Sequence, residues 1–134
     1  MFELDSRLHN DTFFVCDLTL CRVLLMNDKQ FPWLILVPMR NNIAEIIDLP
    51  EQEQQTLLAE SAKVSTVLQQ IFSPYKLNIG ALGNVVRQLH VHHVARFESD
   101  VAWPKPVWGN QAPVAYDNAE ASAILSTLKQ ALSE

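Results

Sequence analysis

Runs of apolar residues separated by turn-forming residues predict five strands along this chain. Short runs rich in Val, Leu, Ile and Phe are typical of strands, and Pro38 ends one of them because proline cannot continue a hydrogen-bonded ladder. Turns are predicted at residues 27–30 and at Gly83-Asn84. Such short connections imply antiparallel pairing of neighbouring strands. The expected strands cover residues 13–18, 20–26, 33–37, 76–82 and 85–97.

Apolar positions spaced three and four residues apart predict a long helix that ends near residue 72. Asp48 is the expected N-cap of this helix, Pro50 lies in its first turn, and Glu51 completes a capping box. The apolar face of the helix is formed by Leu57, Val64, Leu68 and Ile71.

The remaining segments complete the predicted fold. We expect a short helix around residues 4–8, a loop over 98–116, and a terminal helix over 118–132 with Asp117 or Tyr116 near its cap. The order β-β-β-α-β-β-loop-α predicts an α+β fold. It consists of a single antiparallel sheet of about five strands, with a long helix across one face and a C-terminal helix. The 134 residues fit a single domain, residues 1–134.

Composition excludes some partners. There are 10 Lys and Arg residues against 15 Asp and Glu, so the net charge is −5, which argues against a general binder of the nucleic-acid backbone. No signal sequence or membrane-spanning apolar run is recognised, so a soluble, cytoplasmic protein is expected. Cys16 and Cys21 do not form a CxxC pair, and their apolar neighbours predict that both are small core residues.

The segment from residue 88 to residue 96 carries three of the four histidines. In an extended strand, residues two apart share a face. One face would then hold Gln88, His90, His92 and Arg96, and the other would hold Leu89, Val91, His93 and Ala95. Burying several polar groups without a ligand is costly, so the first face predicts a binding site. His93, on the opposite face, is expected to be structural or on the surface.

Phosphate and a metal ion are both possible ligands of the face that carries His90 and His92. His90 and His92 supply two metal ligands, whereas a structural zinc site needs four and a catalytic one usually three. Cys16, Cys21 and His93 could complete such a set only if the fold brings them near. Residue types alone leave this choice open.

The stretch from Asn78 to Arg96 resembles the histidine triad family of nucleotide hydrolases and transferases. The resemblance rests on histidines that alternate with apolar residues, on Gly83-Asn84 four residues before Gln88, and on the order of elements. The start Gln-Leu-His-Val-His and the segment Ala-Trp-Pro-Lys-Pro-Val-Trp-Gly, residues 102–109, resemble a bacterial branch described as diadenosine-tetraphosphate-hydrolase-like. Membership implies a homodimer that binds nucleotides and needs no cofactor.

Two registers fit the triad. One places Gln88, His90 and His92 at the three positions, and the other places His90, His92 and Val94 there. We favour the first register because it keeps Asn84 four residues before the first position and Arg96 six residues after the middle one. The first histidine of the triad is then a glutamine.

The resemblance implies a catalytic role for each triad position. His90 would attack the α-phosphate and form a nucleotidyl-histidine intermediate, oriented by an acceptor such as the carbonyl of Gln88. His92 would donate to a non-bridging phosphate oxygen. Gln88 would lie near the bridging oxygen or leaving group, where an amide donates a hydrogen bond but delivers no proton.

Further residues are candidates for binding the nucleotide. Asn84 is a candidate for phosphate, Asn27 for the ribose hydroxyls, and Asn78 is a weaker phosphate candidate. Arg96 either binds phosphate or pairs with an acid such as Asp100. Trp33 is expected in the core. Trp103 and Trp108 either pack, within the chain or in a dimer, or form a lid beside the nucleotide.

The prediction is therefore a hydrolase or transferase of the histidine triad type. It would cleave a dinucleoside polyphosphate or a nucleoside phosphoramidate through His90, with no metal, no nucleic-acid partner and no membrane partner. The alternative is a nucleotide-binding or interaction module with little turnover, because Gln88 weakens proton delivery.

Overall fold

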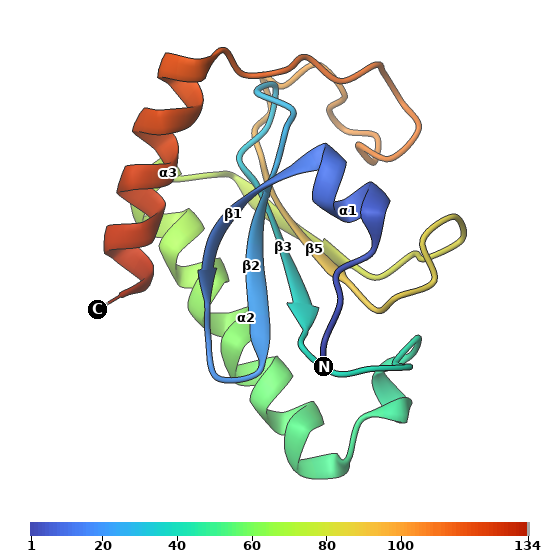
Figure 1. Cartoon of the computed structure of the whole chain (residues 1–134). Helices are drawn as coiled ribbons and strands as arrows, with labels where there is room; N and C mark the ends of the chain where they lie inside the picture. The colour runs from blue at the N-terminus through green and yellow to red at the C-terminus, as the bar shows by residue number, and fades with distance from the viewer. Residues whose placement is uncertain (134) are drawn as a thin grey trace.

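A computed structural model describes residues 1–133 (Figure 1). The five strands form one antiparallel sheet in the order β1-β2-β3-β5-β4. The predicted α+β fold is confirmed, with the long helix α2 across one face. The elements are α1 (Ser6–Asp11), β1 (Thr12–Asp17), β2 (Cys21–Met26), β3 (Trp33–Pro38), the 3-10 helix η1 (Ile46–Asp48), α2 (Glu51–Phe72), β4 (Lys76–Gly80), β5 (Val91–Arg96) and α3 (Asn118–Leu132).

The two faces of the sheet bury separate apolar clusters. Helices α2 and α3 cover one face, where Val64 and Leu68 of α2 pack on Leu34 and Leu36 of β3. The other face lies under α1, the N-terminal segment and the loop of residues 98–116 (Figure 1). This second cluster contains Leu8, Phe31, Trp33, Ile35, Val37, Val94, Ala102 and Val107. The two central strands therefore present alternate residues to two different environments.

Strand β5 is shorter than predicted. It spans Val91–Arg96, and residues 85–90, which were expected to begin it, form an irregular loop. The ladder between β3 and β5 ends where Leu36 faces Val91. Beyond this point the chain pairs elsewhere, because the N–H of Leu89 donates to the carbonyl of Ile43 at 2.9 Å. Strand β4 likewise ends at Gly80, not at residue 82.

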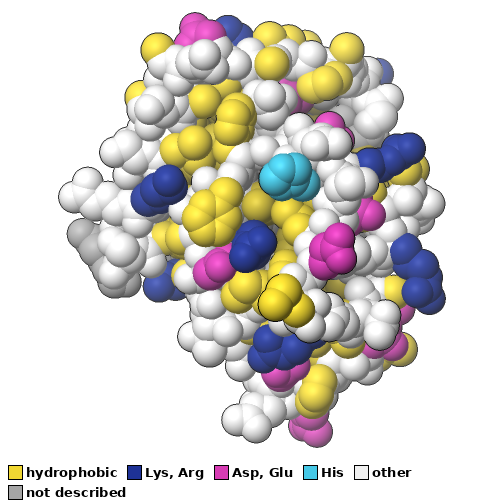
Figure 2. Space-filling view, in the orientation of Figure 1, with side chains coloured by type: hydrophobic (Ala, Val, Ile, Leu, Met, Phe, Trp, Pro, Cys, Tyr) yellow, Lys and Arg dark blue, Asp and Glu magenta, His cyan; other side chains and the backbone are white. Residues whose placement is uncertain are grey.

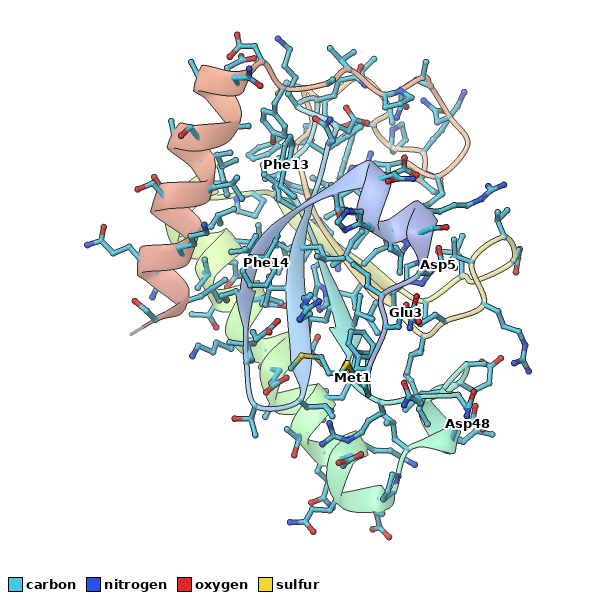
Figure 3. All side chains as sticks on the ribbon, viewed as in Figure 1. Met1, Glu3, Asp5, Phe13, Phe14 and Asp48 are labelled. Carbon is cyan, nitrogen blue, oxygen red and sulfur yellow. The ribbon has the colours of Figure 1, made fainter. Side chains whose placement is uncertain are left out.

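The starts of two helices also differ from the prediction. Helix α1 begins at Ser6, where the carboxylate of Asp5 accepts from the N–H of Arg7 at 2.8 Å. Asp48 does not cap α2; it lies in η1 (labelled in Figure 3), and its carboxylate accepts from the N–H groups of Glu45 and Ala44. These two hydrogen bonds lower the pKa of Asp48. Helix α2 instead follows Pro50 directly.

The other local predictions agree with the structure. Asp117 caps α3 by accepting from the N–H of Glu120 at 2.8 Å. Cys16 and Cys21 are free and lie in or against the core, and burial raises the pKa of both thiols. None of the helices within residues 1–133 combines the length and apolar character that crossing a bilayer requires.

Candidate active site

His90 lies immediately before β5, and one hydrogen bond fixes its tautomer. Its Nδ1 is 2.7 Å from the carbonyl oxygen of Gln88. A carbonyl only accepts, so Nδ1 carries the proton and the lone pair lies on Nε2. This is the acceptor expected from the sequence. The side chain that the resemblance names as nucleophile thus has an unprotonated nitrogen available for attack.

His92 has the opposite tautomer. The indole N–H of Trp33, on the neighbouring strand β3, donates to Nδ1 of His92 at 2.9 Å. A neutral ring that accepts at Nδ1 carries its proton on Nε2. Burial, with smaller contributions from His90 and His93, lowers the pKa of His92 to about 3. His92 is therefore a neutral hydrogen-bond donor at pH 7. Its ring centroid lies 5.0 Å from that of His90.

His93 faces the other side of the sheet and has both nitrogens bonded. Its Nδ1 lies 3.1 Å from the carbonyl of Val91, and its Nε2 lies 2.7 Å from the hydroxyl of Ser61 on α2. The residue has no exposed surface, and burial lowers the pKa of its imidazole to about 4. Of the two expectations for His93, structural or surface, the structural one holds.

A cavity of about 530 Å³ opens beside His92. Trp33 and Trp108 form part of its wall, and the rings of His92 and Trp108 are 5.5 Å apart. Asn27 also lines it; its side-chain oxygen accepts from the N–H of Tyr116 at 2.9 Å, which leaves its amide nitrogen to meet a ligand. Further lining residues are Asn10, Asp11, Met26, Asp28, Val107, Gly109, Gln111, Pro113 and Ala115.

The sequence did not identify all of these residues. Trp33 was expected in the core, and it is buried there, but its N–H also orients His92. Asp28 was interpreted only as part of a turn, although it lines the cavity and its Oδ1 accepts from the N–H of Gln30 at 3.1 Å. Trp108 lines the cavity and packs edge-on against Trp33 and His92, whereas Trp103 packs edge-on against Tyr75. The signal that could have identified Asp28 as a site residue was its place in a polar turn directly after β2.

The Gln88 side chain is fixed by the N-terminal segment. Its amide oxygen accepts from the N–H of Asp5, and its amide nitrogen donates to the carbonyl of Glu3, both at 2.9 Å. Figure 3 shows Glu3 and Asp5 in the N-terminal segment, which passes beside the loop that precedes β5. The second N–H of the amide has no hydrogen-bond partner within residues 1–133.

The expected phosphate contact of Arg96 is wrong. Its side chain is 1% exposed, and its Nε and Nη2 donate to the two carboxylate oxygens of Asp100 at 2.8 and 3.1 Å. Nη1 donates to the side-chain oxygen of Asn78 at 2.7 Å, so Asn78 also serves this buried pair. Although burial raises the pKa of Asp100, its hydrogen bonds from Arg96 and from the N–H of Phe97 produce a net lowering. The expected alternative, an Arg96–Asp100 pair, is the one observed.

Asn84 lies on the exposed loop before β5, next to Gly83, whose φ of +77° suits a glycine. It does not line the cavity beside His92. Within the described part of the chain, no three His, Cys, Asp or Glu side chains are grouped to hold a metal ion. Figure 2 shows histidine surface at one place on this face, and His90, His92 and His93 are all buried.

Comparisons with known proteins found a matching family model and similar solved structures. A family model described as HIT domain matches residues 7–99. A histidine triad protein from Bradyrhizobium japonicum is 47% identical with a TM-score of 0.95, over 98% of both chains. A histidine triad protein from Marinobacter aquaeolei is 46% identical with a TM-score of 0.97, over 99% of this chain and 97% of that one. One from Sinorhizobium meliloti is 43% identical with a TM-score of 0.93, over 96% of both. None of the curated protein sequences compared is significantly similar.

Proposed function

Because the chain belongs to the histidine triad family, whose members are typically nucleotide-binding hydrolases and transferases, we propose that it cleaves a nucleotide substrate at the α-phosphate. The observation that carries this proposal is the hydrogen bond from Nδ1 of His90 to the carbonyl of Gln88. This bond leaves the lone pair of the His90 ring on Nε2. The neighbouring imidazole, His92, has the opposite tautomer, with its proton on Nε2. A nucleophile paired with a fixed donor is what phosphoryl transfer through a covalent intermediate requires.

In this proposal each side chain has one task. Nε2 of His90 attacks the α-phosphorus, and the positive charge that develops on the ring is stabilised by the bond from Nδ1–H to Gln88. The Nε2–H of His92 donates to a non-bridging oxygen of the phosphate. Asn27 lies in the cavity where it can bind the ribose hydroxyls, and Asn84 remains the candidate for phosphate on the loop.

Covalent trapping tests the proposal. The protein is incubated with ATP or diadenosine tetraphosphate labelled at the α-phosphate and quenched in denaturant. We expect an acid-labile, base-stable adduct that is lost in His90→Ala. It should persist in His9→Ala, because His9 is exposed on α1. An adduct that persists in His90→Ala would refute the assignment of the nucleophile.

The second candidate function is a nucleotide-binding module with little turnover. It is favoured by one observation, the glutamine amide at the first triad position, which cannot act as an acid. Micromolar nucleotide affinity without adduct or turnover would establish it. The diadenosine-tetraphosphate-hydrolase-like branch and a cytoplasmic location remain predictions.

We also propose that the protein is a homodimer. Strand β4 is an edge of the sheet, and Tyr75 and Ile79 on this edge are 66% and 52% exposed. Leu82 and Val85 extend the exposed apolar surface along the following loop. Open apolar sheet edges in soluble proteins are usually covered, which supports a second copy here. Light scattering on purified protein, with Ile79→Lys as the disrupting variant, tests this proposal.

A further inference from the structure

Within residues 1–133, no acidic side chain is hydrogen-bonded to His90, whose one hydrogen bond joins Nδ1 to the carbonyl of Gln88. At neutral pH, cleavage at the α-phosphate leaves a group that either departs as an anion or must first take up a proton. The other two triad positions are Gln88, whose backbone carbonyl bonds to Nδ1 of His90, and His92, whose ring centroid lies 5.0 Å from that of His90. A glutamine amide releases no proton at neutral pH, and the N-terminal backbone holds this amide at both ends.

His92 is prevented from acting as the acid by its partner. A cationic imidazole carries protons on both nitrogens, and a proton on Nδ1 would face the indole N–H of Trp33 at 2.9 Å. Two donors would then oppose each other in a buried position, and the existing hydrogen bond would be lost. His92 therefore keeps its neutral form, whose remaining N–H can stabilise charge on the phosphate but does not transfer its proton.

Other titratable groups around the site do not fill the gap. Asp11 and Asp28 line the cavity, whose lining includes His92 but not His90, and Oδ1 of Asp28 accepts from the N–H groups of Gln30 and Val114. On the other side of Gln88, a surface hollow is lined by Met1, Glu3 and Arg87, all exposed. A guanidinium does not deprotonate in proteins. Glu3 contacts Gln88 through its backbone carbonyl, and within residues 1–133 its side chain makes no hydrogen bond to a triad residue.

We infer that this site selects phosphoanhydrides, such as dinucleoside polyphosphates and nucleoside triphosphates, over nucleoside phosphoramidates. The inference rests on the proposed covalent mechanism through His90. A phosphate leaving group is a stable anion near neutral pH, whereas an amine leaving group needs a proton on its nitrogen before the P–N bond breaks.

The anhydride reaction balances without an acid. The lone pair of His90 Nε2 forms the bond to phosphorus while the bridging P–O bond breaks, and that electron pair leaves on the phosphate oxygen. Water then attacks phosphorus, the P–N bond breaks, and its electron pair returns to Nε2. The proton lost by the water goes to solvent. Throughout, the proton stays on Nδ1 of His90, where it donates to the carbonyl of Gln88.

The test compares two substrates that share the same adenylyl group: diadenosine tetraphosphate and adenosine 5′-phosphoramidate. We expect kcat/KM at neutral pH to be at least about 100-fold higher for the anhydride, the lower end of the usual contribution of general acid catalysis. The phosphoramidate rate should rise toward acid pH, where solvent protonates the amine. Equal kcat/KM for the two substrates would overturn the inference.

Variants at Gln88 sharpen the test. Gln88→His adds a titratable imidazole, so the ratio of phosphoramidate to anhydride activity should rise about tenfold or more. Gln88→Asn supplies no acid and should leave that ratio unchanged. Glu3→Gln removes the nearby exposed carboxylate and should also leave it unchanged; a fall in phosphoramidate activity there would identify Glu3 as the acid and overturn the inference.

A leaving-group series on the unmodified protein keeps the inference testable if the Gln88 variants do not fold. Aryl esters of AMP with increasingly basic phenols should react progressively more slowly. A rate that does not depend on the basicity of the phenol would show that an acid protonates the leaving group. The proposed function fails separately: it fails if no substrate labels His90. If both anhydride and phosphoramidate label His90 at similar rates, only the selectivity inference fails.

Discussion

His92 and His93 are neighbours in the sequence and have similar burial, yet they have different tasks. Both are at most 6% exposed, and burial lowers the pKa of each well below the ordinary value for histidine. They differ in their partners. Both nitrogens of His93 are bonded within the protein, to Val91 and Ser61, whereas His92 uses only Nδ1.

This difference separates a structural histidine, His93, from the one proposed to act on the substrate, His92. Within residues 1–133, no internal hydrogen bond uses the Nε2 atom of His90 or of His92. Neither burial nor a shifted pKa distinguishes the two faces of β5, because both properties occur on each. The nitrogen that remains available does distinguish them, and it lies on the face that carries the cavity.

The largest expected effect comes from comparing a substitution on one face of the histidine segment with a substitution on the other. His90→Ala should reduce turnover by at least about 10⁴-fold, because it removes the nucleophile, with little loss of stability. His93→Gln should keep turnover within about tenfold but lower the free energy of unfolding by about 1–3 kcal/mol, because it disturbs the buried bond to Ser61. Steady-state kinetics and urea unfolding measure both. The comparison breaks down if His93→Gln abolishes turnover in folded protein.

A variant of the Arg96–Asp100 pair tests whether every polar residue on the same face as His92 takes part in function. Asp100→Asn leaves the buried guanidinium without its carboxylate and should cost about 3–5 kcal/mol of stability. Nucleotide affinity of the folded fraction should not change, because the pair lies outside the cavity. Chemical denaturation and calorimetric titration give the two quantities.

The chain offers a matched control for this pair. Arg22 and Asp17 also make two hydrogen bonds to each other, but their side chains are 29% and 39% exposed. Asp17→Asn should therefore cost no more than about 1 kcal/mol. A similar cost for both variants would show that burial is not what makes the Arg96 pair important.

These results show which parts of the site the sequence could predict. Alternation along a strand correctly placed His92 and His93 on opposite faces, because that rule depends only on local backbone geometry. The predicted extent of β5 was wrong because it depends on where the pairing between β3 and β5 stops, which is not a property of the local sequence. The choice between phosphate and Asp100 for Arg96 was left open because it depends on how the chain turns after β5.

The partners of the glutamine and of the second histidine were beyond prediction for a similar reason. Gln88 bonds to Glu3 and Asp5 across more than 80 residues of sequence. Trp33 reaches His92 across 59 residues. A buried tryptophan on an apolar strand is usually explained by packing alone, so nothing in its local sequence indicates that its N–H orients a catalytic imidazole.

Trp33 should have a smaller, specific effect. Trp33→Phe keeps an aromatic ring but removes the donor to Nδ1 of His92, so we expect turnover to fall by about 10- to 100-fold. The pKa of His92 should rise, because Nδ1 becomes free to accept a proton. Trp33→His, which retains a ring N–H, should restore part of the activity. The ¹⁵N chemical shifts of His92 report its tautomer directly.

Trp108→Phe is the matched control for this change. The indole N–H of Trp108 is buried and has no hydrogen-bond partner within residues 1–133, although its ring also lies against His92. Its replacement should leave the tautomer of His92 unchanged. If both variants shift the ¹⁵N signals equally, ring packing and not the hydrogen bond orients His92.

The pH dependence of stability is an expected effect that both faces of β5 share. The pKa values of His92 and His93 in the folded protein are about 3 and about 4, below the unfolded value of about 6.5. Between about pH 4 and about pH 6.5 the unfolded chain therefore binds more protons, so stability falls as the pH is lowered through this window. Each histidine contributes at most about 1.4 kcal/mol per pH unit. His93→Gln should remove about half of the slope in urea unfolding measured across this range. An unchanged slope would show that His93 remains neutral for a reason other than its burial against α2.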